Sequence, residues 1–186
     1  VKGQGGAILT SSGVSSDVPL WGQVYDLIDL PLASTSAIKS NVVVATGSLL
    51  NGTSVLVPAD FTQPSVPRGI SILGLGSTGF VQLYGYTGLG VLQTEIVNYS
   101  SGTVAFSSYP YAVISSITLS ATSVNNLFPG ATFWIGVSSR IALPNQIAES
   151  TAVYKVTENQ VLRATYTVIA GAVSAIDIPT VTATND

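Results

Sequence analysis

The sequence contains no cysteine, no histidine and few charged residues. Without cysteine, a disulfide framework, a zinc–thiolate site and a thiol nucleophile are excluded. Without histidine, Ser-His-Asp triads and histidine-ligated metal sites are excluded as well. We therefore predict that the chain is not an enzyme and has no catalytic residues, no cofactor-binding residues and no metal ligands.

Charge is scarce along the whole chain. Charged residues make up 8% of the sequence, whereas an ordinary soluble domain has about 25%. The six basic residues stand far apart in the sequence, which gives no basic stripe for nucleic acid and no polybasic patch for a membrane. Because protein interfaces are depleted in charge, this composition favours a subunit of an assembly over a soluble protein coated with serine and threonine.

Long hydrophobic runs are missing too. The longest smooth run, residues 168–176, is much shorter than the ~20 apolar residues that span a bilayer. The first residues, VKGQGG, also lack the apolar core of a signal peptide. We therefore expect a soluble, non-exported chain without a membrane or nucleic-acid partner.

The residues that are present predict an all-β fold. Val, Ile and Thr are abundant and favour strands, while apolar residues at helical spacing are not found. We expect short antiparallel strands that form a sandwich or a partly open barrel, with an extended N-terminal arm. The expected strands cover residues 41–46, 53–58, 70–75, 80–86, 91–97, 103–106, 112–119, 131–137, 140–143, 152–157, 161–169 and 172–178.

The chain is expected to divide into an N-terminal arm, residues 1–40, and a β-sandwich-like domain, residues 41–186. The arm begins with a stretch rich in glycine and serine that is typical of a flexible linker. It continues as a segment bracketed by prolines, which fits a short helix from Trp21 to Leu30 or an extended segment docked on another surface. Within the domain, the central part covers about residues 67–145, and a C-terminal hairpin and last strand cover about residues 150–180.

Several turns predict hairpins between consecutive strands. Asn51-Gly52 is a strong hairpin dipeptide and lies between two expected strands. Residues 87–90 and residues 158–160 separate two further pairs of strands.

Residues 74–79, GLGSTG, match the glycine pattern of a dinucleotide-binding loop. That loop requires a helix after the third glycine, whose N-terminus holds the pyrophosphate. Here FVQLYGY follows, which is typical of a strand. We therefore interpret these glycines as a hairpin bend and expect no cofactor.

The aromatic and the acidic residues each give one further prediction. An aromatic group in the middle of the chain is expected to pack in the core, with stacking on a carbohydrate or on bases as the alternative. The acidic residues lie on separate elements and are expected to be solvated at the surface rather than paired for glycoside hydrolysis. The aromatic group consists of Tyr99, Phe106, Tyr109, Tyr111 and Phe128.

Four residues of the arm stand apart because they precede the strand-rich region. They are Trp21, Tyr25, Leu27 and Leu30. Trp and Tyr side chains with leucine neighbours are typical of interface hot spots. These residues either pack on their own domain or fill pockets on a partner, and we predict them as the interface anchors of the arm.

A series of short motifs follows in a fixed order along the chain. The motifs are a Pro-Arg pair that opens a strand, a Thr-Glu pair, an aromatic residue that leads into an Ile-Ser-Ser-Ile run, a Gly-Val pair, a Leu-Pro pair and a C-terminal hairpin. They stand at Pro67-Arg68, Thr94-Glu95, residues 111–117, Gly136-Val137, Leu143-Pro144 and residues 153–161. Over about residues 50–180, this order resembles structural proteins of tailed bacteriophages, namely capsid decoration (cement) and minor head proteins.

The resemblance implies an all-β virion protein located on the capsid surface. Its partners would be the major capsid protein and further copies of itself, as a trimer, and it would stabilise the shell by bridging capsomers non-covalently. It implies no catalytic residues. The alternatives are a tail, baseplate or fibre component and a β-module that binds host glycans.

Overall fold

The chain forms two compact units, Val1–Pro31 and Leu32–Asp186. The computed structural model describes residues 6–9, 20–23, 33–45, 51–123, 130–143, 145–153, 156–158, 161–162 and 165–178. In the first unit, β1 (Gly6–Leu9) pairs antiparallel with β2 (Leu20–Gln23), and Ile8 lies opposite Trp21. The linker interpretation is therefore wrong for Gly6–Leu9, and Leu20–Gln23 is extended rather than helical.

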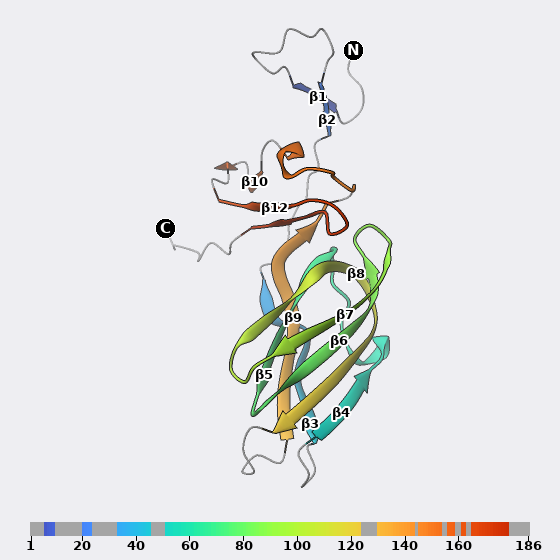
Figure 1. Ribbon diagram of the computed structural model, residues 1–186, viewed down its shortest axis with the longest axis vertical. Helices are drawn as coiled ribbons and strands as arrows, with labels where there is room; N and C mark the ends of the chain where they lie inside the picture. Colours follow the sequence, from blue (N-terminus) through green and yellow to red (C-terminus); the bar gives the residue numbers. More distant parts are fainter. Residues whose placement is uncertain are drawn as a thin grey trace. The chain divides into compact units, whose positions relative to one another are not determined.

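The second unit consists almost entirely of strands (Figure 1). Two short 3-10 helices, η1 (Pro58–Asp60) and η2 (Ser150–Ala152), interrupt them. No helix among the described residues is long and apolar enough to cross a membrane. The strands are β3 (Ser34–Ala45), β4 (Asn51–Leu56), β5 (Arg68–Leu75), β6 (Ser77–Thr87), β7 (Leu92–Tyr99), β8 (Val104–Ser123), β9 (Gly130–Ala142), β10 (Thr157–Glu158), β11 (Val161–Leu162), β12 (Thr167–Ile169) and β13 (Ala175–Asp177). Residue 40, where the sequence placed the end of the arm, lies inside β3.

Nine of these strands form one antiparallel sheet that does not close, which confirms the all-β fold class. Seven follow the order β12-β13-β9-β5-β8-β6-β7, while β3 pairs with β9 and β4 pairs with β8. The two longest strands, β8 and β9, hold the sheet together because each pairs with three others. The expectation of short strands is wrong for these two, since residues 104–119 and 131–142 each lie in one continuous strand rather than in two.

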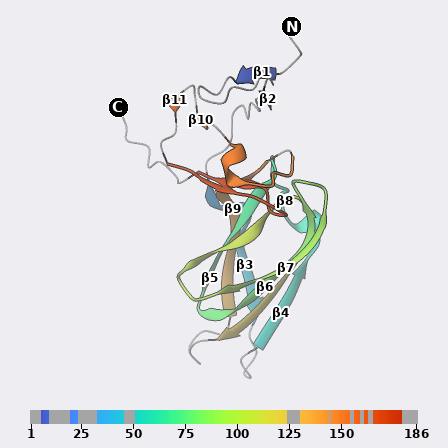
Figure 2. The ribbon, with the colours of Figure 1, turned by 45° about the horizontal axis from the view of Figure 1, so that its top comes forward.

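The sheet folds over itself and encloses the core. Figures 1 and 2 show β6 and β7 lying over β5 and β9. Tyr99 of β7 contacts Phe133 of β9 edge to face, with the ring centroids 5.0 Å apart, although these strands are at distant places in the sheet order. Between the two halves lie fully buried side chains such as Ile72, Leu83 and Ile117. Burial of such side chains contributes about 1.5–3 kcal/mol each and is the main force that holds the halves together.

Two expected hairpins are wrong. Asn51-Gly52 does not form a turn but lies inside β4, opposite Thr122 and Ala121 of β8. The two strands expected to form this hairpin, β3 and β4, pair with different strands rather than with each other. The glycine-rich residues 74–79 are a bend, as expected, but the flanking strands β5 and β6 do not pair. Gly76, with φ 76°, turns the chain from one half of the sheet into the other.

The hairpin between β6 and β7 is confirmed by their antiparallel pairing. The C-terminal hairpin also forms, since Thr157 pairs with Leu162 and Glu158 with Val161. Both of its strands are shorter than expected. The first, β10, covers only Thr157–Glu158, and Ala152, where it was expected to begin, lies in η2. The second, β11, ends at Leu162, and β12 is a separate strand that pairs with β13.

One gap in the sheet is filled by a side chain. Along one part of β8, the pairing with β5 ends at Tyr111 and the pairing with β4 begins at Ile117. Between them the Gln63 amide donates to the carbonyl of Ile114 and accepts from its N–H, both at 2.8 Å. Gln63 therefore satisfies the backbone where no strand does.

Candidate interaction surface

The outer face of β4, β8, β6 and β7 is broad and rich in exposed apolar side chains. Residues opposite each other in neighbouring strands lie on the same face of a sheet, so the register gives the composition of this face row by row. We call it the tyrosine face, after the exposed Tyr84 and Tyr86. Its rows are Val113, Tyr86 and Leu92; Ser116, Tyr84 and Thr94; Val55, Thr118, Gln82 and Ile96; and Thr53, Ser120, Phe80 and Asn98.

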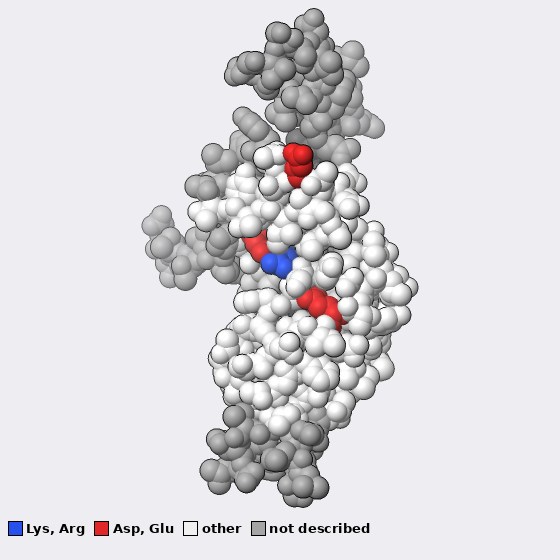
Figure 3. All heavy atoms as spheres, viewed as in Figure 1, with Lys and Arg blue, Asp and Glu red and all other residues white. Residues whose placement is uncertain are grey.

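None of these residues carries a charge. Figure 3 shows the same side of the molecule as Figure 1, and the surface in front of β4 and the lower parts of β6 and β7 contains no charged atoms. Ile96 and Val55 are each 58% exposed. Contiguous exposed apolar surface of this kind marks interaction sites in soluble proteins, so the tyrosine face is the candidate functional surface.

Two edge strands of the sheet, β7 and β3, are protected, in contrast to the face itself. Glu95 is the inward-pointing neighbour of Thr94 on the edge strand β7, opposite the buried Leu83. The edge strand β3 carries Lys39, breaks its register on both sides of that residue, and has Asn41 at φ 56°. Inward charges, lysines and bulges on edge strands prevent pairing with other chains. Assembly through these edges is therefore disfavoured.

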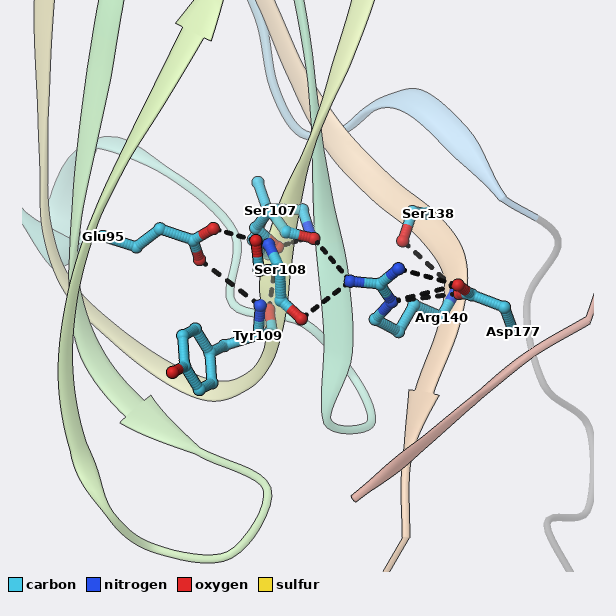
Figure 4. A network of polar contacts seen from close by, with 8 residues as sticks. Glu95, Ser107, Ser108, Tyr109, Ser138, Arg140 and Asp177 are labelled. Carbon is cyan, nitrogen blue, oxygen red and sulfur yellow. Dashed lines mark hydrogen bonds and ion pairs between the residues drawn. The ribbon is translucent and has the colours of Figure 1, made fainter. Parts of the chain in front are cut away.

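Glu95 also joins β7 to the first part of β8, where the sheet is open (Figure 4). Its carboxylate accepts from the N–H of Ser108 at 2.5 Å and from that of Tyr109 at 3.3 Å. A charged acceptor makes such hydrogen bonds stronger than those between neutral groups. One side chain thus replaces the strand pairing that would have closed the sheet.

Arg140 of β9 holds the opposite side of the same segment of β8 (Figure 4). Its Nη1 donates to the carbonyls of Ser107 at 3.1 Å and Ser108 at 2.7 Å. Its Nε and Nη2 donate to the carboxylate of Asp177 on β13, with a shortest distance of 2.7 Å. The network therefore connects four strands, and the expectation that the acidic residues are solvated at the surface is wrong for Glu95 and Asp177, whose carboxylates accept hydrogen bonds from β8 and from Arg140.

The Ser107 hydroxyl group of this network makes structural hydrogen bonds. Ser107 Oγ accepts from the N–H of Ile70 at 2.8 Å and donates to the carbonyl of Tyr109 at 2.7 Å. Next to it, the buried Arg68, which opens β5, donates from Nη2 to the carbonyl of Ser138 at 2.6 Å. Burial lowers the pKa of Arg68. These contacts join strands to one another. The network therefore holds the strands of the sheet in place rather than a substrate. Among the described residues, no group of three or more acidic side chains could hold a metal ion.

Burial raises the pKa of Tyr111, and the negative charge of Glu95 raises it further. The Tyr111 hydroxyl donates to Glu95 at 3.5 Å, a contact that ionisation of the tyrosine would turn into repulsion. Burial also raises the pKa of Tyr99, against the effect of its hydrogen bond with Ser77. Both tyrosines therefore stay neutral in the folded protein at a pH that ionises them in the unfolded chain.

We expect Tyr111→Phe to flatten the loss of stability in alkali. Above the ordinary tyrosine pKa of 10.0 the unfolded state of the wild type loses a proton that the folded state keeps, so stability falls as pH rises. The slope from one such group is about 1.4 kcal/mol per pH unit. Urea unfolding between pH 8 and 12 gives the free energy of unfolding of both proteins. Above pH 10, the value for the variant should rise relative to that of the wild type by about 1.4 kcal/mol per pH unit. Parallel curves for the two proteins would contradict the assignment.

The structure leaves the predicted arm anchors largely undescribed. Trp21 lies on β2 opposite Ile8, and nothing further is described of its side chain. Tyr25, Leu27 and Leu30 lie outside the described residues. Their role as anchors stays a prediction.

The aromatic group gives a mixed result. Tyr99 and Tyr111 are buried, and Tyr109 packs against the core, as expected. The expectation is wrong for Phe106, which is 58% exposed, and Phe128 lies outside the described residues. The exposed Tyr84 and Tyr86 were missed, because both alternating positions of β6 carry apolar residues and the sequence does not show which ones face the core.

Comparisons with known proteins do not assign this chain to a family. No protein-family model matches it, and neither the curated proteins nor the solved structures compared with it show significant similarity.

Proposed function

We propose that this chain is a capsid decoration (cement) protein, which binds the outside of an icosahedral phage head and bridges neighbouring capsomers non-covalently. The observation that carries the proposal is the tyrosine face, a broad uncharged sheet surface bearing Tyr84, Tyr86 and Ile96. Exposed apolar surface of this extent marks an interaction site, and a subunit covered by its neighbours buries such a surface.

The mechanism is the burial of apolar and hydroxyl-bearing surface in many copies. Each contact needs only about 1,000 Å² of total buried surface to be specific. Bridging of several capsomers by linked contacts then raises the overall affinity by orders of magnitude without new chemistry. The motif residues of the family resemblance add support from the sequence. Arg68 opens β5, and the Thr94-Glu95 pair lies on β7 at the border of the tyrosine face.

Removal of residues 1–32 is expected to leave the β-domain folded but to abolish binding to heads. The contacts within Leu32–Asp186 make it a compact unit separate from Val1–Pro31, and the predicted anchors Trp21, Tyr25, Leu27 and Leu30 are removed. Thermal unfolding of the truncated protein checks the fold, and co-sedimentation with undecorated heads checks binding. Full occupancy by the truncated protein would rule out the arm as the anchor.

The function itself is tested by counting copies of this chain in purified virions after heads and tails have been separated. A decoration protein is expected at hundreds of copies that travel with heads. A handful of copies, or copies on tails, would replace the proposal with a tail or fibre component. Absence from the particle would overturn both.

Glycan binding is the second candidate, because Tyr84 and Tyr86 stand exposed on one strand, 40% and 45% accessible, among hydroxyl and amide side chains. Exposed aromatic rings can stack on sugars. Tyr111 cannot take part, since it is fully buried. A glycan array probed with the wild type and with Tyr84→Ser tests this candidate, which fails if the two proteins give the same signal.

A further inference from the structure

The edge strand β4 lacks the features that protect the other edges of the sheet. The edge strands in the described part of the chain are β3, β4, β7 and β12. β3 carries Lys39 and a broken register, β7 carries the inward-pointing Glu95, and β12 has three residues. β4 has the sequence NGTSVL, without charge or proline, and its register with β8 is regular. Because proteins blunt the edges that must stay single, a regular uncharged edge is a template for a further strand.

The backbone of β4 has one side without a partner strand. Among the described strands β4 pairs with β8 alone, and Figures 1 and 2 show it at the border of the sheet. Val57 continues its extended backbone, but the N–H and the carbonyl of Val57 bind the carboxylate and the N–H of Asp60, both at 2.8 Å, rather than β8. Backbone groups of successive strand residues point to opposite sides, so those of Val55 and Thr53 point away from β8 as well. They are the groups that a further strand would bind.

A second copy of β4 supplies a matching edge. A half-turn about an axis perpendicular to the sheet at Ser54 places Thr53 of each copy opposite Val55 of the other. Both pairs then bring outward-pointing backbone groups together and can exchange hydrogen bonds, while Ser54 lies opposite itself between them. Thr53 and Val55 are β-branched residues of the same sheet face, and cross-strand pairs of this kind stabilise a sheet.

The charges nearest to β4 favour the antiparallel arrangement. Asp60 closes the C-terminal end of β4 and lines one pocket together with Lys39 of β3. In an antiparallel pair these residues of the two copies lie at opposite ends of the shared ladder, so like charges stay apart. A parallel pair would place them side by side, and a charged peptide would find no counter-charge along β4 itself.

We propose that β4 pairs antiparallel with β4 of a second copy of this chain, across a two-fold axis at Ser54. The pair sets two tyrosine faces side by side and leaves both uncovered, so the inference goes beyond the proposed function and does not depend on it. It specifies a pair rather than the trimer that the resemblance implies. Contact through one strand of six residues is smaller than a standard interface, which buries about 800 Å² on each partner. The pair is therefore expected to form in a concentration-dependent way.

The first test is the molar mass of the full chain by light scattering across a concentration series. The wild type is expected to rise from 19.1 kDa towards twice that mass. Val55→Lys places a charge on the shared edge of each copy and is expected to weaken association at least about tenfold. Ile96→Lys is the matched control, because Ile96 lies in the same row of the tyrosine face, on the opposite edge strand, and both side chains are 58% exposed. It is expected to associate as the wild type does.

The second test uses the absence of cysteine from the chain. Ser54→Cys places two thiols opposite each other on the axis, where Cα atoms about 4.5 Å apart allow a disulfide. In Thr53→Cys the two thiols lie on a diagonal of about 7–8 Å, at the limit of disulfide geometry. Thr53 is the more exposed of the two residues, so random collisions would favour its cross-linking. Mild oxidation is expected to give a covalent pair at least about tenfold faster with Ser54→Cys than with Thr53→Cys.

Several results would overturn the inference. They are a wild type that stays monomeric at its highest soluble concentration, a mass of three chains, an Ile96→Lys variant that associates as weakly as Val55→Lys, and a Thr53→Cys variant that cross-links as fast as Ser54→Cys. Thermal unfolding of each variant separates loss of association from loss of fold. Binding to heads is measured separately on the same samples. A monomer that decorates heads would overturn the pair and keep the proposed function, whereas a pair that never binds heads would do the reverse.

Discussion

Gly136→Ala is expected to lower the free energy of unfolding by about 3 kcal/mol or more, at the upper end of the cost of overpacking a well-packed interior. Gly136 lies in β9 opposite Ser71 of β5, where the first part of β3 crosses closely. A Cβ atom at this position would overlap the carbonyl oxygen of Ser34 and the carbonyl carbon of Thr35. Because these are backbone atoms, no rotamer change can relieve the overlap, and the start of β3 must move away from the sheet.

Gly102→Ala is the matched control for this variant. Gly102 has φ 77° and no atom within 4 Å of an added Cβ, so the substitution costs only the strain of left-handed backbone, about 1–2 kcal/mol. Urea unfolding gives both values, and amide hydrogen exchange should show early opening of β3 in Gly136→Ala alone. Equal losses in the two variants would mean that the approach of β3 to Gly136 does not matter for stability.

Arg140→Met is expected to cost about 2–3 kcal/mol, the value of a few hydrogen bonds to a charged group that is partly accessible to water. The methionine keeps the apolar stem but leaves the carbonyls of Ser107 and Ser108 and the carboxylate of Asp177 without these donors. The side chains of Arg140 and Asp177 are 22% and 30% exposed, so water offsets part of the loss. Unfolding should begin at β13, which pairs with β9 beside Arg140.

Arg140→Lys separates charge from geometry in the same place. A lysine keeps the positive charge near Asp177 but lacks the planar fork that reaches the carboxylate and two carbonyls together. We expect a loss of about half that of Arg140→Met, again in the range of one or two hydrogen bonds to charged groups. Hydrogen exchange of the β13 amides provides the local readout. A change of less than about 0.5 kcal/mol in Arg140→Met, typical of an ordinary surface substitution, would show that the network contributes little.

The sequence by itself determined the fold class and the position of most strands. Strand propensity is local, and the stretches rich in Val, Ile and Thr gave β5, β6 and β7 nearly as they are. Scarcity of charge likewise depends on composition alone, and a protein that works among neighbours stays a prediction from it. The fold class holds for any arrangement of the strands.

Only the tertiary structure decided which strands pair and which faces remain uncovered. β4 follows β3 in the chain and begins with a hairpin dipeptide, yet each of the two strands pairs with a strand distant in the sequence, because burial of the shared core outweighs the preference of one turn. Glu95 and Arg140 are 45 residues apart and meet only through β8. On β6, apolar side chains occupy both alternating sets of positions, so the pattern could not tell the buried Val81 and Leu83 from the exposed Tyr84 and Tyr86. The tyrosine face exists because four strands, brought together by long-range pairing, place their uncharged sides in register, and no local stretch of sequence encodes that register.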